Sequence, residues 1–135
     1  MSRCALCGNV TMNKTFRMPE TPNLILELTL EFSLEIINFT EVLEKAKKYN
    51  VANQLFRSGT SIGANVNEAQ SCESRSDFIH KMKVAAKEAE ETKYWLTLCI
   101  KADSYPKPTG LIEKLQIIIK ILNKIIVSSK QVKMQ

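Results

Sequence analysis

Four polar residues near the middle of this 135-residue chain have the types and the spacing of a hydrogen-bonded site. They are Arg57, Ser61, Asn65 and Glu68, at intervals of four, four and three residues, which places them on one face of an α-helix. One interpretation is a buried network, closed by Arg57 or by a residue of the next helix, that fixes the register between helices. The other interpretation is a ligand-binding or catalytic site. We favour the structural role because no nucleophile-and-base pair accompanies these residues.

Serine catalysis would require His80, the only histidine of the chain, to act as general base for Ser58 or Ser61. We predict no nucleophile elbow around either serine, and His80 falls outside the apolar stripe of its segment. An isolated, exposed histidine is usually only solvated. We therefore expect no catalytic residues and no enzymatic activity.

The sequence also predicts no complete set of metal ligands. Cys4 and Cys7 have the spacing of half a zinc site, but no second C-x-x-C pair or pair of histidines completes it. Asp77-x-x-His80 lacks the second histidine that a di-iron bundle needs. We expect no metal or other cofactor. Because residues 1–22 contain no long apolar signal segment, we expect a cytoplasmic protein with reduced thiols.

Apolar residues recur at helical intervals over four segments, which predicts an all-α, antiparallel up-down-up-down four-helix bundle. Residues 24–32 alternate apolar and polar side chains as a strand does. Phe32, Ile36 and Phe39 then continue at intervals of four and three, which overrides that signal. We predict helices over about residues 27–48, 51–71, 75–99 and 109–129, the third of them capped by Ser74.

The bundle is expected to occupy residues 24–129, between a leader of residues 1–23 and a basic tail of residues 130–135. Met12 and Met18 lie inside the leader, so we leave open a native start downstream of Met1. Gly59 and Gly63 lie four residues apart in the second helix and would let another backbone approach closely. Such packing would compensate for the cost of glycine within a helix, roughly 1 kcal/mol each.

Positive charge is concentrated at the C-terminal end of the chain. The net charge is +5, and residues 104–135 hold six lysines against Glu113 alone. This bias suits a polyanion partner, although it is also common on ordinary solvated surfaces. The candidate contacts with the phosphates of RNA or DNA are Lys81, Lys83, Lys87, Lys114, Lys120 and Lys124.

The last helix carries more apolar surface than one core-facing stripe can cover. Its apolar residues span about 180° of the helix circumference, against the roughly 100° that a bundle helix needs. Lys120 and Lys124 interrupt the run, so we expect no membrane span. Self-association would cover the excess; the alternative is that the leader or the first helix folds over it. The predicted interface residues are Ile112, Ile117, Ile119, Ile121 and Ile126.

Two stretches of the chain resemble the bacterial 23S rRNA intervening sequence proteins, a family of four-helix bundles. The first is QLFRSGTSIGANVNEA at residues 54–69, and the second is FIHKMKVAAKEAEETKYWL at residues 78–96. The likeness covers roughly residues 24–128. It departs mildly at Ala69, where the family pattern often has glycine.

The resemblance implies a homo-oligomer, typically a pentamer, with no catalytic residues to transfer. A related basic bundle of diversity-generating retroelements binds nucleic acid and a reverse transcriptase. By similarity, the shared structural polar positions are Arg57, Ser61, Asn65, Glu68 and Glu91. We therefore expect a non-enzymatic oligomer that binds RNA or DNA through exposed lysines, independently of sequence. The alternative is a protein–protein adaptor or scaffold without a nucleic-acid role.

Overall fold

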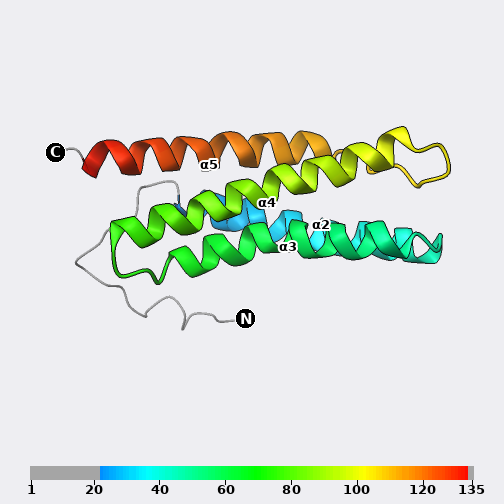
Figure 1. Cartoon of the computed structure of the whole chain (residues 1–135), viewed down its shortest axis with the longest axis horizontal. Helices are drawn as coiled ribbons and strands as arrows, with labels where there is room; N and C mark the ends of the chain where they lie inside the picture. Colours follow the sequence, from blue (N-terminus) through cyan, green and yellow to red (C-terminus); the bar gives the residue numbers. More distant parts are fainter. Residues whose placement is uncertain (1–21, 134–135) are drawn as a thin grey trace.

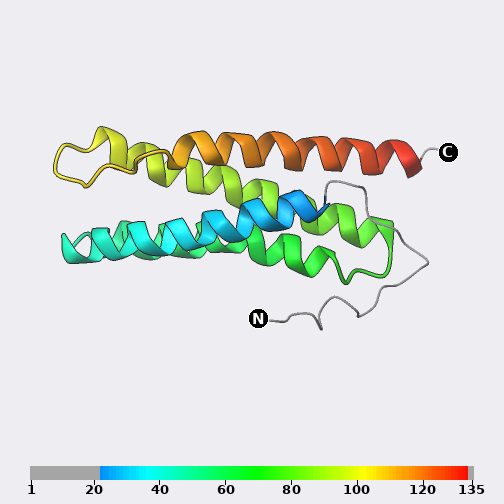
Figure 2. The same ribbon diagram turned by 180° about the vertical axis from the view of Figure 1, so that it is seen from behind.

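The computed structural model describes residues 22–133 as four α-helices, with no strand in that range. The helices are α2 (Pro22–Lys45), α3 (Tyr49–Ala69), α4 (Arg75–Lys101) and α5 (Leu111–Lys133). Figures 1 and 2 show consecutive helices lying side by side and running in opposite directions. Helices α2 and α4 each contact both α3 and α5, so the four helices enclose one core. None of them combines the length and the apolar character needed to cross a membrane.

The core is built from one apolar stripe of each helix. The stripes follow the intervals of three and four residues that the sequence predicts, so each helix turns a single face inward. The buried members are Phe32, Ile36, Phe39 and Leu43 of α2, Leu55, Ile62, Val66 and Ala69 of α3, Phe78, Met82, Ala85, Ala89, Leu96 and Cys99 of α4, and Leu111, Leu115, Ile118, Leu122 and Ile125 of α5.

Helix α2 shows what happens when an alternating sequence is wound as a helix. Ile25 and Thr29 join the buried stripe, but the leucines on either side of them point in other directions. Leu30 remains 64% exposed, and Leu24 and Leu34 are also exposed. A period of two places successive apolar residues around the whole circumference of a helix. Helix α2 therefore keeps an apolar outer surface.

The observed helices differ from the expected ones mainly at their ends. Helix α2 begins at Pro22, five residues earlier than expected, because proline is well tolerated in the first turn. Helix α5 continues to Lys133, so part of the expected tail is helical. Residues 1–21 and 134–135 lie outside the described part of the chain. Most of the expected leader, with Cys4 and Cys7, falls there.

The ends of α4 are fixed by side chains. The Ser74 hydroxyl accepts a hydrogen bond from the backbone N–H of Asp77 at 3.1 Å, as expected of its N-cap. At the other end, the Lys107 ammonium lies 3.1 Å from the carbonyl oxygens of Cys99 and Ile100 and 2.6 Å from that of Ala102. A cation at this position complements the negative end of the helix dipole. The loop before α5 is thereby tied to α4.

Helices α2 and α3 approach each other most closely at the glycines of α3. A Cβ added to Gly59 would lie 2.9 Å from Cγ1 of Ile36, which is fully buried. A Cβ on Gly63 would lie 3.3 Å from the backbone oxygen of Thr29. The missing side chain of Gly59 therefore leaves the space that Ile36 occupies.

Replacing Gly59 with alanine tests this close approach. We expect Gly59→Ala to lower the free energy of unfolding by about 1–3 kcal/mol, because the branched side chain of Ile36 has little freedom to move away. Chemical denaturation of the variant and the parent measures the difference. If helix propensity alone mattered, the variant would instead be more stable by roughly 1 kcal/mol, and that result would contradict the packing argument.

Candidate functional site

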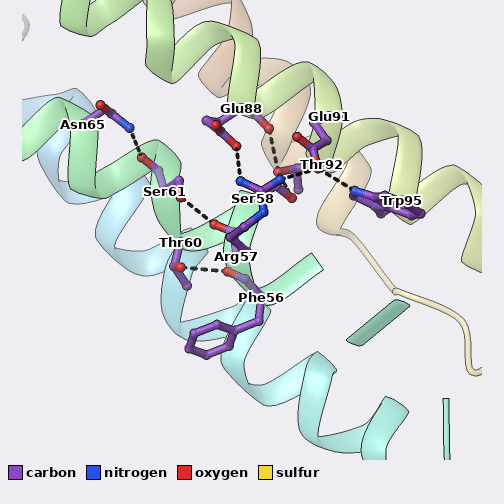
Figure 3. Close-up of polar contacts among 10 residues, drawn as sticks. All are labelled: Phe56, Arg57, Ser58, Thr60, Ser61, Asn65, Glu88, Glu91, Thr92 and Trp95. Carbon is purple, nitrogen blue, oxygen red and sulfur yellow. Dashed lines mark hydrogen bonds and ion pairs between the residues drawn. The ribbon is translucent and has the colours of Figure 1, made fainter. Parts of the chain in front are cut away.

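Figure 3 shows Arg57, Ser61 and Asn65 along one side of α3, with Arg57 directed toward Glu88 and Glu91 of α4. Glu68, further along α3, pairs with Lys81 of α4. We call these four residues of α3 the polar seam: Arg57, Ser61, Asn65 and Glu68. Two of them reach across to α4, and the other two bond to their own helix. The polar seam is therefore divided into separate contacts, and within residues 22–133 no side-chain hydrogen bond joins Arg57 to Glu68.

Arg57 is the centre of the larger contact. Its guanidinium lies 3.3 Å from a carboxylate oxygen of Glu88 and also pairs with Glu91. The indole N–H of Trp95 donates to the same Glu91 carboxylate at 3.0 Å. The side chain of Arg57 is 50% exposed, so the contact lies at the surface rather than in the buried network that we expected.

The electrostatics of this contact favour the ionised forms. The hydrogen bond from Arg57, followed by that from Trp95, lowers the pKa of Glu91 below its ordinary value. The hydrogen bond to Glu91 is also the main reason why the pKa of Arg57 is raised. Arg57 is thus held as a cation by two carboxylates, which leaves it no free charge for a ligand.

The second contact across the helices joins Glu68 to Lys81 of α4. The ammonium nitrogen lies 2.7 Å from the carboxylate oxygen; the side chain of Glu68 is 58% exposed and that of Lys81 is 36% exposed. Exposed pairs of this kind contribute about 0–1 kcal/mol to stability. Here the pair fixes the register of the two helices, that is, which turns of α3 and α4 face each other.

Within the described residues, the side chains of Ser61 and Asn65 form hydrogen bonds to their own helix and none to α4. The Ser61 hydroxyl donates to the Arg57 carbonyl at 2.6 Å, and the Asn65 amide donates to the Ser61 carbonyl at 2.9 Å. The buried polar contact between the helices is instead that of Ser58 and Thr92, whose hydroxyl oxygens lie 3.0 Å apart. The sequence indicated this contact only through the position of Ser58 next to the apolar stripe of its helix.

Two short strings match catalytic motifs by letter but not by structure. Gly59-Thr60-Ser61-Ile62-Gly63 has the pattern G-x-S-x-G, yet it lies inside continuous helix α3 rather than at a strand-to-helix turn. Ser104-Tyr105-Pro106-Lys107 has the pattern S-x-x-K, but the Lys107 ammonium binds helix carbonyls. His80 is exposed on α4. Within residues 22–133, no group of three potential metal ligands comes together.

The six candidate lysines fall into two groups, according to whether they form an ion pair within the described residues. Lys81 pairs with Glu68, and Lys114 of α5 pairs with Glu35 of α2. These hydrogen bonds raise the pKa of both lysines. The other four are exposed and form no ion pair with any residue in the described range: Lys83, Lys87, Lys120 and Lys124.

The five isoleucines assigned to self-association also differ from one another. Ile117 is 53% exposed, whereas Ile112, Ile119 and Ile121 are half-buried beside the core. Ile126 is only 8% exposed because it follows Leu122 by four residues and shares its inward face. Ile126 is therefore already covered within the single chain.

An apolar surface lies where α2 meets α5; it contains Ile117 and Ile121 of the predicted interface and adds residues of α2 that the sequence did not indicate. The Glu35–Lys114 pair marks the edges that face each other. Leu28 and Val42 lie seven residues before and after Glu35, hence on the same edge of α2. Ile117 and Ile121 follow Lys114 by three and seven residues, so they lie on the same edge of α5 as Lys114. We call these residues, with Leu24, the apolar strip: Leu24, Leu28, Val42, Ile117 and Ile121.

Comparison with known proteins identifies a family and a solved structure that match most of the chain. The family model described as 23S rRNA-intervening sequence protein matches residues 23–124. A crystal structure of a protein with unknown function from the S23 ribosomal protein family of Bacteroides thetaiotaomicron is 38% identical, with a TM-score of 0.74. That match covers 78% of this chain and 97% of the other. No curated protein matches the chain. The resemblance drawn from the sequence is thereby confirmed.

The charge of Glu91 gives the polar contacts a pH dependence. Because the folded protein lowers the pKa of Glu91, its carboxylate stabilises the fold above its unfolded pKa of about 4.3. This contribution is lost as the pH falls through the folded value. We expect Glu91→Gln to be less stable than the parent at pH 7 by about 1 kcal/mol and nearly equal to it at about pH 2.

Thermal unfolding at both pH values checks this expectation. Glu90→Gln is the matched control, since Glu90 is an exposed neighbour that forms no ion pair with the described residues. A stability difference between parent and Glu91→Gln that is unchanged at the lower pH would contradict the assignment.

Proposed function

This chain belongs to the 23S rRNA-intervening sequence protein family, and from that premise we propose that it is a non-enzymatic, cytoplasmic protein that binds RNA or DNA. It forms a homo-oligomer, a pentamer, of up-down-up-down four-helix bundles. Exposed lysines contact the phosphate backbone without reading its sequence. The observation that carries the proposal is the excess of unpaired lysines on the outer faces of α4 and α5.

The charge distribution supports a polyanion partner. Lys83 and Lys87 of α4, and Lys120 and Lys124 of α5, extend into solvent without a carboxylate partner in the described residues. Lysine ammonium groups in such positions neutralise phosphates and release the counterions condensed on nucleic acid. The Trp95 indole is half-buried, donates its N–H to Glu91 and packs edge-to-face with Tyr94; we assign it to packing between side chains, which favours backbone contact over base recognition.

The apolar strip supports self-association. Helices α2 and α5 are antiparallel (Figure 2), so Leu28, seven residues before Glu35, lies at the level of Ile121, seven residues after Lys114. Val42 is 48% exposed at one end of the same strip. These apolar residues flank the Glu35–Lys114 ion pair. Exposed apolar side chains gathered on one side of a molecule are typical of an interface, and a second copy of the chain supplies complementary ones.

A protein–protein adaptor is the second candidate function, and the outer surface of α2 favours it. Leu26 and Leu30 line a groove of about 360 Å³ whose other wall contains Gly63 and Ala64 of α3. This groove is apolar rather than basic. An adaptor would retain its partners after nuclease treatment, whereas a nucleic-acid binder would lose those that RNA or DNA bridges.

Filter binding to single-stranded RNA of mixed sequence tests the proposed function. We expect binding at about 50 mM salt that weakens steeply by about 200 mM, with a slope of roughly −0.7 per neutralised phosphate in a plot of log affinity against log salt. An unrelated RNA of the same length should bind equally. Absence of binding at the lower salt concentration would refute the proposal.

A further inference from the structure

Helices α2 and α5 carry opposite net charges. Helix α2 contains five glutamates and a single lysine, so its net charge is −4. Helix α5 contains five lysines and a single glutamate, so its net charge is +4. Within residues 22–133, only the Glu35–Lys114 ion pair joins the two helices. Most of the charge on α2 and α5 therefore has no ion-pair partner in the described part of the chain.

The outward side of α2 combines this negative charge with exposed leucines. Leu30 and Leu34 lie one turn apart and are exposed, and Glu27 and Glu31 each precede one of them by three residues, which places the carboxylates beside the leucines. Arg57, the only cation of α3, pairs with α4 and leaves this surface uncompensated from that side. We call it the acidic face: Glu27, Leu30, Glu31 and Leu34.

The neighbouring positive charge does not neutralise the acidic face. Glu31 is near enough to Lys114 for its charge to contribute, after Glu35, to the raised pKa of that lysine. The ion pair itself is formed by Glu35. Glu27 and Glu31 form no ion pair with any residue in the range 22–133, and both are exposed.

The outward side of α5 has the same construction with the opposite sign. Ile117 and Val127 are exposed, and Lys120 and Lys124 lie between them at intervals of three, four and three residues. Neither lysine pairs with a carboxylate of the described residues. Glu113, the one carboxylate of α5, lies seven residues before Lys120, about 10 Å along the helix. We call this surface the basic face: Ile117, Lys120, Lys124 and Val127.

The two faces also match in height along the bundle. Helices α2 and α5 are antiparallel (Figure 2), and the Glu35–Lys114 pair fixes their relative height. The carboxylates of the acidic face lie four and eight residues before Glu35, and the lysines of the basic face lie six and ten residues after Lys114. A second copy placed beside the first without a shift along the bundle would therefore bring each lysine within one turn of a carboxylate.

One chain cannot bring these two faces together, because both lie opposite the buried stripes of their helices. Two copies can, because the acidic face of one is complementary to the basic face of the other. Contacts between two different surfaces of identical subunits close into a ring when the rotation between neighbours permits it. The basic face shares Ile117 with the apolar strip, so the same contact covers part of that strip.

We propose that the acidic face of α2 in one copy packs against the basic face of α5 in the next copy. This inference rests on the homo-oligomer of the proposed function and deepens it by naming the two surfaces that meet. The exposed aliphatic side chains are buried in the contact, and the opposite charges select which face meets which. Lys120 and Lys124 then serve the contact between copies, so phosphate contacts fall to lysines outside the basic face.

Two charge-reversed variants test this contact. Glu27→Lys/Glu31→Lys makes the acidic face basic, and Lys120→Glu/Lys124→Glu makes the basic face acidic. Each variant then presents two faces of like charge, so we expect the protein concentration needed for assembly to rise about tenfold or more. Light scattering coupled to size-exclusion chromatography measures assembly, and circular dichroism establishes that each variant is folded.

An equimolar mixture of the two variants separates a contact between copies from an effect within one chain. In the mixture, the reversed α2 face of one variant meets the reversed α5 face of the other, and the two unchanged faces are also opposite in charge. We expect the variants to associate with each other at concentrations where neither associates alone. Affinity capture of a tagged copy of one variant should then recover the other.

Lys83→Glu/Lys87→Glu is the matched control, since it reverses two exposed lysines four residues apart on α4. It should assemble at the same concentrations as the parent. Charge-reversed variants that assemble as the parent does, or a mixture that stays dissociated, would overturn the inference and leave the acidic face to a different protein. A parent protein that is monomeric at every concentration would instead overturn the proposed homo-oligomer.

Discussion

The limited width of a helix face governs this structure. A helix in a four-helix core buries one stripe, about 100° wide or somewhat more. The buried apolar residues of α3 and α4 fit that width, although Tyr49 and Phe56 of α3 and Tyr94 and Ile100 of α4 are exposed. Helices α2 and α5 carry more apolar residues than the core accepts, so Leu24, Val42 and Ile117 remain exposed. Exposed aliphatic side chains therefore lie mainly on α2 and α5.

The contacts between neighbouring helices differ from one pair of helices to the next. Small residues set the α2–α3 distance, where Gly59 makes room for Ile36. Ion pairs and the buried Ser58–Thr92 contact set the register of α3 against α4. Each of these contacts satisfies its own polar groups. Apolar side chains remain exposed on α2 and α5, and unpaired lysines remain exposed on α4 and α5 within the described residues; from these two properties we infer self-association and polyanion binding.

Periodicity predicted the inward residues well, because intervals of three and four are a local property of the chain. The four-helix fold, the Ser74 cap and the family all followed from the sequence. Contacts between helices were harder to predict, because they depend on how one helix is shifted along its neighbour. Arg57 could be recognised as a seam residue, but its pairing with Glu88 could not. The exposed leucines of α2 were hidden in an alternating pattern first considered as a strand signal. Ile126 was assigned outward although it shares the inward face of Leu122.

The mass of the purified, nuclease-treated protein in solution is the most direct test of the proposed self-association, because we infer that another copy covers the exposed apolar residues of α2 and α5. Light scattering coupled to size-exclusion chromatography measures that mass over a range of protein concentrations. We expect one species at about five times the chain mass of 15.3 kDa, still assembled after the nucleic acid is removed. A single species of 15.3 kDa that persists at high protein concentration would contradict it.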